Sequence, residues 1–325
     1  MTQAIRDASQ NSQTAFDLTV RSVETIADEI VALVVESADG KPLPAWEPGA
    51  HIDLVLTDEL VRQYSLCGDP TDSSSWRMGI LREPKSRGGS EFIHTNVSAG
   101  SRISARGPRN NFPLVAGKHY RFVAGGIGIT PLLPMISQLN AAGADWSLLY
   151  GGRTASSMAF LEELRQYGDR VTVRPQDEYG LLDIVSFLSH DEDVAEVYCC
   201  GPEPLITAIE AVCESNDSID LHVERFSPKE LDGDVIDESF EVDCTSTGIT
   251  LQIPPGKSIL EVAKAAGIDI MSSCSEGTCG TCETDVIEGI PEHRDSILTP
   301  EERKAGESIM VCVSRCIGKR IVLDL

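Results

Sequence analysis

The sequence predicts a multidomain protein that combines an antiparallel β-barrel, an α/β domain with a mostly parallel sheet, and a small α+β domain. The length of 325 residues is more than one hydrophobic core usually organises. The hydrophobic pattern changes twice along the chain, near residues 115 and 237. With 41% apolar and 24% charged residues, the chain has the composition of an ordinary globular protein.

Residues 1–115 are the first predicted domain. From residue 16 onward, apolar and polar residues alternate in runs such as FDLTVRSVETIADEIVALVVES and HIDLVLTD, which Gly and Pro interrupt. A period of two residues is typical of strands with one buried face, so these runs indicate the short strands of a barrel or a sandwich. A short helix is expected near residues 90–97.

Residues 116–226 are the second predicted domain, and here the pattern changes. The strand-like runs YRFVA, WSLLYGGR, VTVRPQ and VYCCG are interleaved with segments of helical length, PLLPMISQLNAAG, MAFLEELRQYG and EPLITAIEAVCES. Strands that alternate with helices of this length predict βαβ units and therefore a mostly parallel sheet.

Residues 227–237, in the acidic and turn-rich run SPKELDGDVIDESF, are predicted to be a linker. Residues 238–325 form the third predicted domain, which begins with a hairpin in FEVDCTSTGITLQI and ends with two strands, SIMVCVS and RIVLDL. Between them lies an amphipathic helix, whose apolar side is expected to contain Ile259, Leu260, Val262, Ala263 and Ala266.

The charge of the chain limits its partners. It carries 51 acidic and 27 basic side chains, a formal net charge of −24, which repels nucleic acid and anionic lipid. The N-terminus lacks the basic and apolar regions of a secretory signal, and no run of about 18 apolar residues predicts a membrane span. We therefore expect a cytoplasmic protein that binds neither nucleic acid nor membrane.

Four cysteines have the spacing of metal ligands: Cys274, Cys279, Cys282 and Cys312. The first three stand as CxxxxCxxC and the fourth lies further on in MVCVS, a pattern typical of a plant-type 2Fe–2S cluster. A structural zinc site is the main alternative, because four thiolates also suit zinc. Gly277 and Gly280 permit the positive φ angles that a loop needs to direct backbone N–H groups at sulfur.

The remaining cysteines have a simpler interpretation. Cys316 lies four residues after Cys312 and is assigned no role. Four others occur in apolar or strand-like runs and are expected to be buried core residues: Cys67, Cys199, Cys213 and Cys244.

The C-terminal motifs resemble those of the phthalate dioxygenase reductase family. The segment from SILEV through SSCSEGTCGTCETD and PEHRDSIL to IMVCVSR is similar to that family's ferredoxin domain. The resemblance covers nearly the whole chain from about residue 15, with three sets of motifs in the family's order. It implies an FMN-binding barrel, an NADH-binding α/β domain and a β-grasp ferredoxin domain that holds the cluster.

Two motifs of the first domain have the chemistry of a flavin phosphate site. Arg62 and Tyr64 of RQYSL share one face of a strand, and glycines with a hydroxyl precede a short helix in LREPKSRGGSEF, which favours an anion site. The resemblance implies that Tyr64 and Ser65 border the flavin ring and that Arg62 contacts its phosphate. The second motif leaves no obvious AMP-binding segment, so FMN is preferred to FAD. The flavin-binding residues predicted in this way are Arg62, Tyr64, Ser65, Leu81, Arg82, Arg87, Gly88, Gly89 and Ser90.

A glycine-rich turn in the second domain follows strand YRFVA and opens a helix, as a nucleotide phosphate site requires. It departs from GxGxxG, because Pro131 occupies the third position, and instead resembles the GGxGxTP turn of the ferredoxin reductase superfamily. CCGPEPL ends another strand at the same expected sheet edge. The resemblance implies that these segments border the nicotinamide, and the residues concerned are Gly126, Gly128, Thr130, Cys200, Gly201 and Pro202.

The ribose end of the dinucleotide is predicted at Arg153 of YGGR and Asp177 of RPQDEYG. Acidic groups there would repel a 2′-phosphate and accept a hydrogen bond from a 2′-hydroxyl, so NADH is preferred to NADPH. Phe226 of HVERF resembles the family's aromatic residue that covers the flavin. The residues predicted to act at the hydride-transfer centre are therefore Ser65, Cys200 and Phe226.

The resemblance implies a reductase that takes hydride from NADH on FMN and passes single electrons through the 2Fe–2S cluster to a terminal Rieske-type oxygenase. No cysteine is followed two residues later by histidine, so this chain is not expected to hold a Rieske cluster itself. Docking is expected at the rim of the cluster loop, near Glu276, Thr278 and Glu283. A reductase for another acceptor and a zinc-binding or redox-sensing interaction protein are the alternatives.

Overall fold

The structure is a computed structural model of the whole chain, and it divides into two compact units, Met1–Glu224 and Arg225–Leu325. It describes residues 15–57, 60–83, 88–189, 195–214, 216, 218–228 and 237–325. Among these residues, no helix has both the length and the apolar character needed to cross a membrane.

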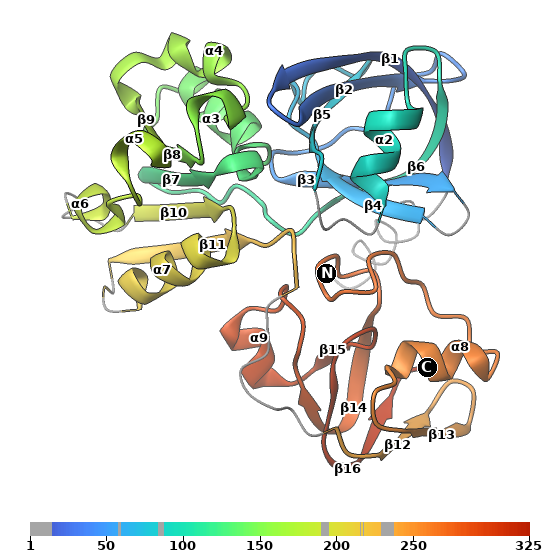
Figure 1. Cartoon of the computed structure of the whole chain (residues 1–325). Helices are drawn as coiled ribbons and strands as arrows, with labels where there is room; N and C mark the ends of the chain where they lie inside the picture. Colours follow the sequence, from blue (N-terminus) through green and yellow to red (C-terminus); the bar gives the residue numbers. More distant parts are fainter. Residues whose placement is uncertain are drawn as a thin grey trace. The chain divides into compact units, whose positions relative to one another are not determined.

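The first sheet is antiparallel and curls around its own core (Figure 1). Its strand order is β4-β3-β6-β1-β2-β5, and the strands are β1 (Phe16–Ala27), β2 (Ile30–Ser37), β3 (Ala50–Thr57), β4 (Leu60–Ser65), β5 (Trp76–Leu81) and β6 (Arg102–Asn110). An antiparallel bridge connects Leu66, the residue after the edge strand β4, with Met78, inside the other edge strand β5. This bridge brings the two edges of the sheet together at one point, so the sheet curls into a half-barrel, in agreement with the predicted barrel. The expected short helix is α2 (Gly89–Asn96).

The second sheet is parallel throughout, as predicted for βαβ units. Its order is β11-β10-β7-β8-β9, with β7 (His119–Gly125), β8 (Asp145–Gly152), β9 (Val171–Pro175), β10 (Ala195–Cys200) and β11 (Ile219–Glu224). The α-helices of this part are α3 (Leu132–Ala141), α4 (Leu161–Leu164), α5 (Gln176–Tyr179), α6 (Ile184–Leu188) and α7 (Glu203–Cys213). The 3₁₀ segments are η1 (Gly126–Ile129), η2 (Ala155–Ser157) and η3 (Arg165–Arg170).

One expected helix of this part is broken. The run MAFLEELRQYG was predicted as a continuous helix, but α4 ends at Leu164 and continues as the 3₁₀ segment η3. Gly168 has φ 56° and ψ −130° inside η3, which is not helical and which glycine adopts more easily than other residues.

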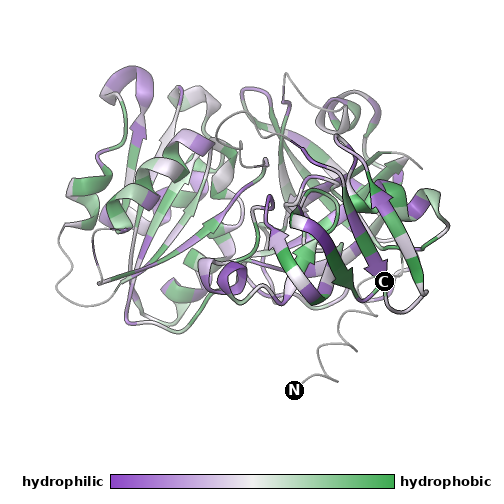
Figure 2. Cartoon of the chain, turned by 90° about the horizontal axis from the view of Figure 1, so that it is seen from below, coloured by the Kyte–Doolittle hydropathy of each residue, from purple (hydrophilic) through white to green (hydrophobic). Residues whose placement is uncertain are grey.

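The barrel and the parallel sheet share one hydrophobic core. Buried residues of the barrel side, including Ile30 and Cys67, pack in the same cluster as Phe122 and Tyr150 of the parallel sheet. The two parts therefore form a single compact unit, and the predicted boundary near residue 115 lies in the connection between their sheets. The domain boundaries themselves stay predictions. Figure 2 shows apolar segments alternating with hydrophilic ones along the strands, as expected for strands that bury one face.

The third sheet is mixed, and its order is β13-β12-β16-β14-β15. Its strands are β12 (Phe240–Cys244), β13 (Ile249–Ile253), β14 (Glu283–Glu292), β15 (Ser308–Met310) and β16 (Arg315–Leu323), and its helices are α8 (Ile259–Ala265) and α9 (Pro300–Ala305). Strands β12 and β16 run parallel, and the other neighbours are antiparallel. A mixed sheet with α8 packed against its core is the expected α+β, β-grasp arrangement.

Two local expectations for this unit are wrong. Ala266 is exposed, because α8 ends at Ala265 and the chain turns at Gly267, which has φ 83°. SIMVCVS is not one strand, because β15 ends at Met310. The N–H groups of Val313 and Ser314 both bond to the carbonyl oxygen of Met310, so Cys312 lies in a turn.

Candidate functional site

The two predicted flavin motifs meet at Arg62. A Cβ atom placed on Gly89 would lie 2.2 Å from Cγ and 2.9 Å from Nε of Arg62, so the arginine side chain rests directly on the first residue of α2. Gly88, just before the helix, has φ 88°, which favours glycine. A helix N-terminus presents N–H groups and partial positive charge, to which Arg62 adds a full charge. These residues fit a phosphate group, which is what a flavin mononucleotide requires here.

Other residues of the second flavin motif have partners within the chain. Arg82 forms a bidentate ion pair with Glu91, with two N···O distances of 2.7 Å. The Ser90 hydroxyl accepts a hydrogen bond from the N–H of Glu83 at 3.1 Å. Leu81, at the end of β5, packs partly buried against the core. Arg87 lies outside the described residues, and the binding roles of all these side chains stay predictions.

Tyr64 and Ser65 are the last two residues of β4, and the side chain of Ser65 contacts the second sheet. Tyr64 packs against the barrel core, and burial raises its pKa. The hydroxyl of Ser65, which is buried, points at Oε2 of Glu224 at 3.5 Å. Burial raises the pKa of Glu224 to about 8, although the Ser65 hydroxyl opposes this shift.

The sequence reasoning missed Glu224. It is the last residue of β11 and stands in register with Cys200 at the end of β10. Its position within HVERF, at the carboxyl end of a parallel strand, was the available signal, since ligands of open α/β sheets bind at that edge. The Cys200 thiol is fully buried, and burial raises its pKa well above the ordinary value, so it stays protonated near neutral pH.

Replacement of Glu224 by glutamine is expected to flatten the pH dependence of stability. Because the pKa of Glu224 rises from 4.5 to about 8 on folding, the stabilising effect of its proton is complete below 4.5 and is lost as the pH rises through 8. The melting temperatures of the Glu224→Gln variant and of wild type should be measured from pH 5 to pH 9. The melting temperature of the variant should rise relative to that of wild type as the pH increases. Glu214→Gln, at an exposed site after α7, is the control. A melting-temperature difference that stays constant with pH would contradict the shift.

The glycine-rich turn packs against the end of β10. A Cβ atom on Gly128 would lie 2.2 Å from the carbonyl oxygen of Cys200, and one on Gly201 would lie 3.0 Å from Cα of Gly125. Gly126 has φ 55° and open space around it. The two predicted nicotinamide segments, η1 and the turn before α7, are therefore in backbone contact at the carboxyl edge of the sheet. Pro202 is the residue that precedes α7.

Thr130 links this turn to the barrel. Its hydroxyl donates to the carbonyl oxygen of Ile127 at 2.9 Å, and the residue is buried. Its methyl group would lie 2.8 Å from a Cβ atom on Gly79 of β5. The turn can approach the barrel this closely because residue 79 is glycine.

The predicted ribose residues lie together, at the ends of neighbouring strands. Arg153 follows β8 and Asp177 lies in α5 after β9, and the N–H of Asp177 donates to the carbonyl oxygen of Arg153 at 3.2 Å. Both side chains are exposed, as a subsite for a solvent-facing ribose requires. Phe226 is 43% exposed and belongs to the second unit, so its role at the flavin stays a prediction.

The four cysteines of the cluster motif are buried and hydrogen-bonded to one another. Interactions with the neighbouring thiols lower two pKa values: Cys279 and Cys312 lower that of Cys274, and Cys312 lowers that of Cys282. Within the described part of the chain, no three His, Cys, Asp or Glu side chains surround a position for a single metal ion. A 2Fe–2S cluster needs only a pair of thiolates at each iron.

Backbone N–H groups point at these sulfur atoms, as an iron–sulfur site requires. The N–H groups of Glu276 and Thr278 lie 3.3 and 3.4 Å from Sγ of Cys274, and that of Thr281 lies 3.4 Å from Sγ of Cys279. Gly277 and Gly280 have φ angles of 70° and 72°, as expected from the sequence. The loop therefore fits a plant-type 2Fe–2S cluster.

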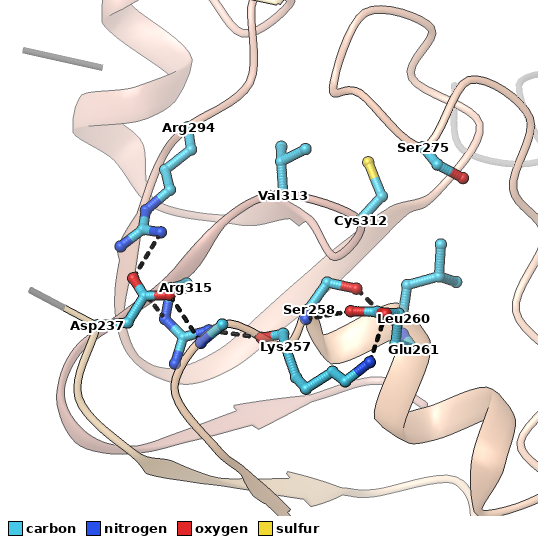
Figure 3. A pocket seen from close by; sticks show the side chains of 11 residues that line it. Asp237, Lys257, Ser258, Leu260, Glu261, Ser275, Arg294, Cys312, Val313 and Arg315 are labelled. Atoms are coloured by element: carbon cyan, nitrogen blue, oxygen red, sulfur yellow. Dashed lines mark hydrogen bonds and ion pairs between the residues drawn. The ribbon is translucent and has the colours of Figure 1, made fainter. Parts of the chain in front are cut away.

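Two arginines, Arg294 and Arg315, form ion pairs beside the turn that contains Cys312. Figure 3 shows Asp237 between Arg294 and Arg315 beside a pocket of about 450 Å³ that Cys312 also lines. Asp237 lies 2.9 Å from Nη1 of Arg294 and 3.5 Å from Nε of Arg315. Arg315 is buried and also donates to the carbonyl oxygen of Lys257. These bonds tie the residues after Cys312 to the start of α8.

Replacement of Gly277 by alanine is expected to impair cluster assembly. The added methyl group would lie 2.6 Å from Cγ2 of Val313 and 2.9 Å from Cα of Asp295, at a φ of 70° that an L side chain rarely adopts. The loop must shift, so its N–H groups turn away from sulfur, and the iron content of purified protein should fall. Gly267→Ala, with φ 83° and open space, is the matched control for the φ effect alone. Equal iron in both variants would show that the close approach at Gly277 is unimportant.

The fold and these sites define an oxidoreductase with a nucleotide-binding part and an iron–sulfur part. Residues 122–211 match the model of the oxidoreductase NAD-binding domain, and residues 242–316 match that of the 2Fe-2S iron-sulfur cluster binding domain. The second segment contains all four cysteines of the cluster motif, which favours the cluster over zinc.

The chain belongs to the phthalate dioxygenase reductase family. The solved structure of phthalate dioxygenase reductase, described as modular for electron transfer from pyridine nucleotides to [2Fe-2S], is 33% identical with a TM-score of 0.71, covering 98% of this chain and all of that one. The phenoxybenzoate dioxygenase subunit beta of Ectopseudomonas oleovorans is 38% identical over 95% of this chain and 97% of its own. An intact type IV self-sufficient cytochrome P450 monooxygenase is 42% identical with a TM-score of 0.87, covering 96% of this chain, which spans 41% of that protein.

Proposed function

We propose that this protein is the NADH-dependent reductase component of a two-component Rieske oxygenase. The observation that carries the proposal is the buried group of four thiols, which receives backbone N–H groups, on the same chain as a paired flavin and nicotinamide site. Such a chain has the parts to accept electrons in pairs and release them singly. The likeness to reductase and dioxygenase subunits supports an oxygenase as the acceptor.

When bound, FMN accepts hydride from NADH and the cluster carries single electrons. The chain's own residues position and shield these groups. Arg62 and the N-terminus of α2 hold the flavin phosphate, and Ser65 with Glu224 lies at the edge where the barrel meets the nicotinamide turn. Glu224, with a pKa of about 8, can hold a proton there at neutral pH.

NADH is the proposed nucleotide, because Asp177 beside Arg153 places an acidic group at the ribose end. The carboxylate accepts hydrogen bonds from ribose hydroxyls and repels a 2′-phosphate. Gly128 and Gly201 keep the two turns in contact, so the dinucleotide binds against backbone at the carboxyl edge of the sheet.

The partner docks transiently at the rim of the cluster loop, near Glu276, Thr278 and Glu283. The net charge of −24 favours a partner with a basic docking face, and it speeds encounter at low salt. The reaction is placed in the cytoplasm, where nicotinamide and reduced thiols are available.

A cytochrome P450 haem is the second candidate acceptor. The likeness to a self-sufficient P450 monooxygenase, at 42% identity, supports it. The two candidates need the same flavin, nicotinamide and cluster sites and differ only in the protein that receives the electrons.

The experiment begins with the visible spectrum of purified protein under anaerobic conditions. Flavin and 2Fe–2S absorption should bleach when NADH is added, and the released flavin should be identified as FMN. Anaerobic titration of the reduced protein into an oxidised Rieske oxygenase, and separately into a ferric P450, then identifies the acceptor by which of the two is reduced faster. A colourless protein, or one that NADH does not bleach, would refute the reductase proposal.

A further inference from the structure

Arg77, on strand β5, joins the barrel to the α/β part within the first unit. Its Nη1 and Nη2 atoms donate to the carboxylate of Glu163 at 2.9 and 3.1 Å. Nε and Nη2 donate to the carbonyl oxygen of Cys67 at 3.3 and 2.6 Å. The guanidinium also lies over the ring of Phe160, 5.0 Å from its centroid. One side chain therefore contacts the barrel and two residues of the segment that forms α4.

On the barrel side, Arg77 fixes the end of the flavin strand. Cys67 follows Ser65 by two residues, and its N–H donates to the carbonyl oxygen of Arg77 at 2.9 Å. The main chain and the side chain of Arg77 thus both bind the peptide group of Cys67. The exit of β4, and with it the position of Ser65, is therefore tied to Arg77.

On the other side, the same strand touches the nicotinamide turn. Gly79 shares a strand face with Arg77, and a Cβ atom there would lie 2.8 Å from Cγ2 of Thr130 and 3.1 Å from Cε2 of Phe160. Phe160 has φ 62°, a conformation that a residue with a side chain rarely adopts. Phe160, immediately before α4, therefore lies close to both Gly79 and the Arg77 guanidinium.

The ion pair between Arg77 and Glu163 is better suited to fixing geometry than to stabilising the fold. The side chains of Arg77 and Glu163 are 29% and 36% exposed, and pairs with this much solvent contact contribute little to the free energy of unfolding. A bidentate arginine–carboxylate contact nevertheless fixes direction as well as distance. Hydride transfer is sensitive to such control, because a misplacement of about 1 Å can cost about a hundredfold in rate.

We propose that Arg77 is a positioning residue for hydride transfer: through its bonds to Cys67 and Glu163 and its contact with Phe160, it holds the flavin strand β4 in place against the α/β part that carries the nicotinamide turn. The inference rests on the proposed function, since it concerns the same hydride step. The inference gives the contact between the barrel and the α/β part a role in positioning for hydride transfer. None of the predicted binding residues has this role.

Two variants test the role on protein loaded with flavin and cluster. Glu163→Gln keeps the shape of the carboxylate and removes its charge, and Arg77→Lys keeps the charge and removes the planar fork. In anaerobic stopped-flow mixing with saturating NADH, the rate constant of flavin reduction should fall about 10- to 100-fold. The affinity for NAD⁺, measured by calorimetry, and the melting temperature of the protein should match wild type.

The control is Glu162→Gln, which breaks the exposed ion pair with Arg165, the first residue after α4, and should leave every readout at the wild-type value. If wild-type flavin is not reduced by NADH, the proposed function fails. If wild type is reduced normally and Glu163→Gln is reduced at the same rate, the positioning role is refuted. Parallel losses of rate, NAD⁺ affinity and melting temperature would also refute it, because they indicate a structural role. Should Arg77→Lys fail to fold, Glu163→Gln decides alone.

Discussion

Replacement of Cys312 by serine is expected to abolish electron transfer from NADH to cytochrome c, a one-electron acceptor, while NADH still reduces the flavin. Serine has nearly the same size, but its hydroxyl is a hard oxygen donor where iron–sulfur clusters take soft thiolates. Loss of a supporting contact around a metal typically costs 10- to 100-fold, so loss of a ligand should cost at least about 100-fold in the rate of cytochrome c reduction. Reduction of ferricyanide, which accepts electrons from the flavin directly, should stay at the wild-type rate.

Cys316→Ser is the matched control for this change. Cys316 is also buried and lies four residues further along, but its thiol donates to the carbonyl oxygen of Arg320 in the strand β16. The control protein should contain a full complement of iron and reduce cytochrome c normally. Two irons per chain and normal cytochrome c reduction in Cys312→Ser would contradict the ligand assignment.

The behaviour of Cys312 illustrates what the sequence could and could not predict of the fold. The alternation in SIMVCVS is that of a strand, and period alone cannot show that the strand ends at Met310. The turn forms because the N–H of Leu260, in α8, bonds to the carbonyl oxygen of Val311 and draws that segment to the helix. A contact between segments about 50 residues apart thus overrides the local preference. By contrast, the alternation of strands and helices over residues 116–226 was enough to predict the parallel sheet, because that pattern has few other solutions.

The same distinction applies to the site. The spacing of the cysteines and the glycine turns are local features, so the sequence located these segments. The partner of Ser65 is 159 residues away, and nothing local to RQYSL indicates Glu224. The contact between Arg62 and Gly89 likewise depends on how α2 packs beside β4. The sequence was enough to predict which residues belong to the site. The contacts between these residues could be seen only in the folded structure.

Replacement of Gly128 by alanine should weaken NADH binding, and a displacement of the turn by about 1 Å can also cost about a hundredfold in the rate of hydride transfer. The new Cβ atom would lie 2.2 Å from the carbonyl oxygen of Cys200 and 2.4 Å from its carbon, well inside the 3.0 Å that real Cβ contacts respect. Because both neighbours are backbone in a buried strand end, η1 has to move away from β10. Overpacking of this kind also costs about 1–3 kcal/mol of stability. The apparent KM for NADH and the melting temperature measure the two effects.

Gly143→Asn is the control for the Gly128 change. Gly143 lies just beyond the other end of α3, has φ 69° and has open space where a side chain would go, and asparagine tolerates that conformation. The control should bind NADH normally. In Gly128→Ala, dithionite should still bleach the flavin and cluster completely, which separates lost nucleotide binding from lost cofactors. An unchanged KM for NADH in Gly128→Ala would mean that the nicotinamide does not bind where η1 meets Cys200. The proposed nicotinamide site between η1 and the turn before α7 would then be refuted.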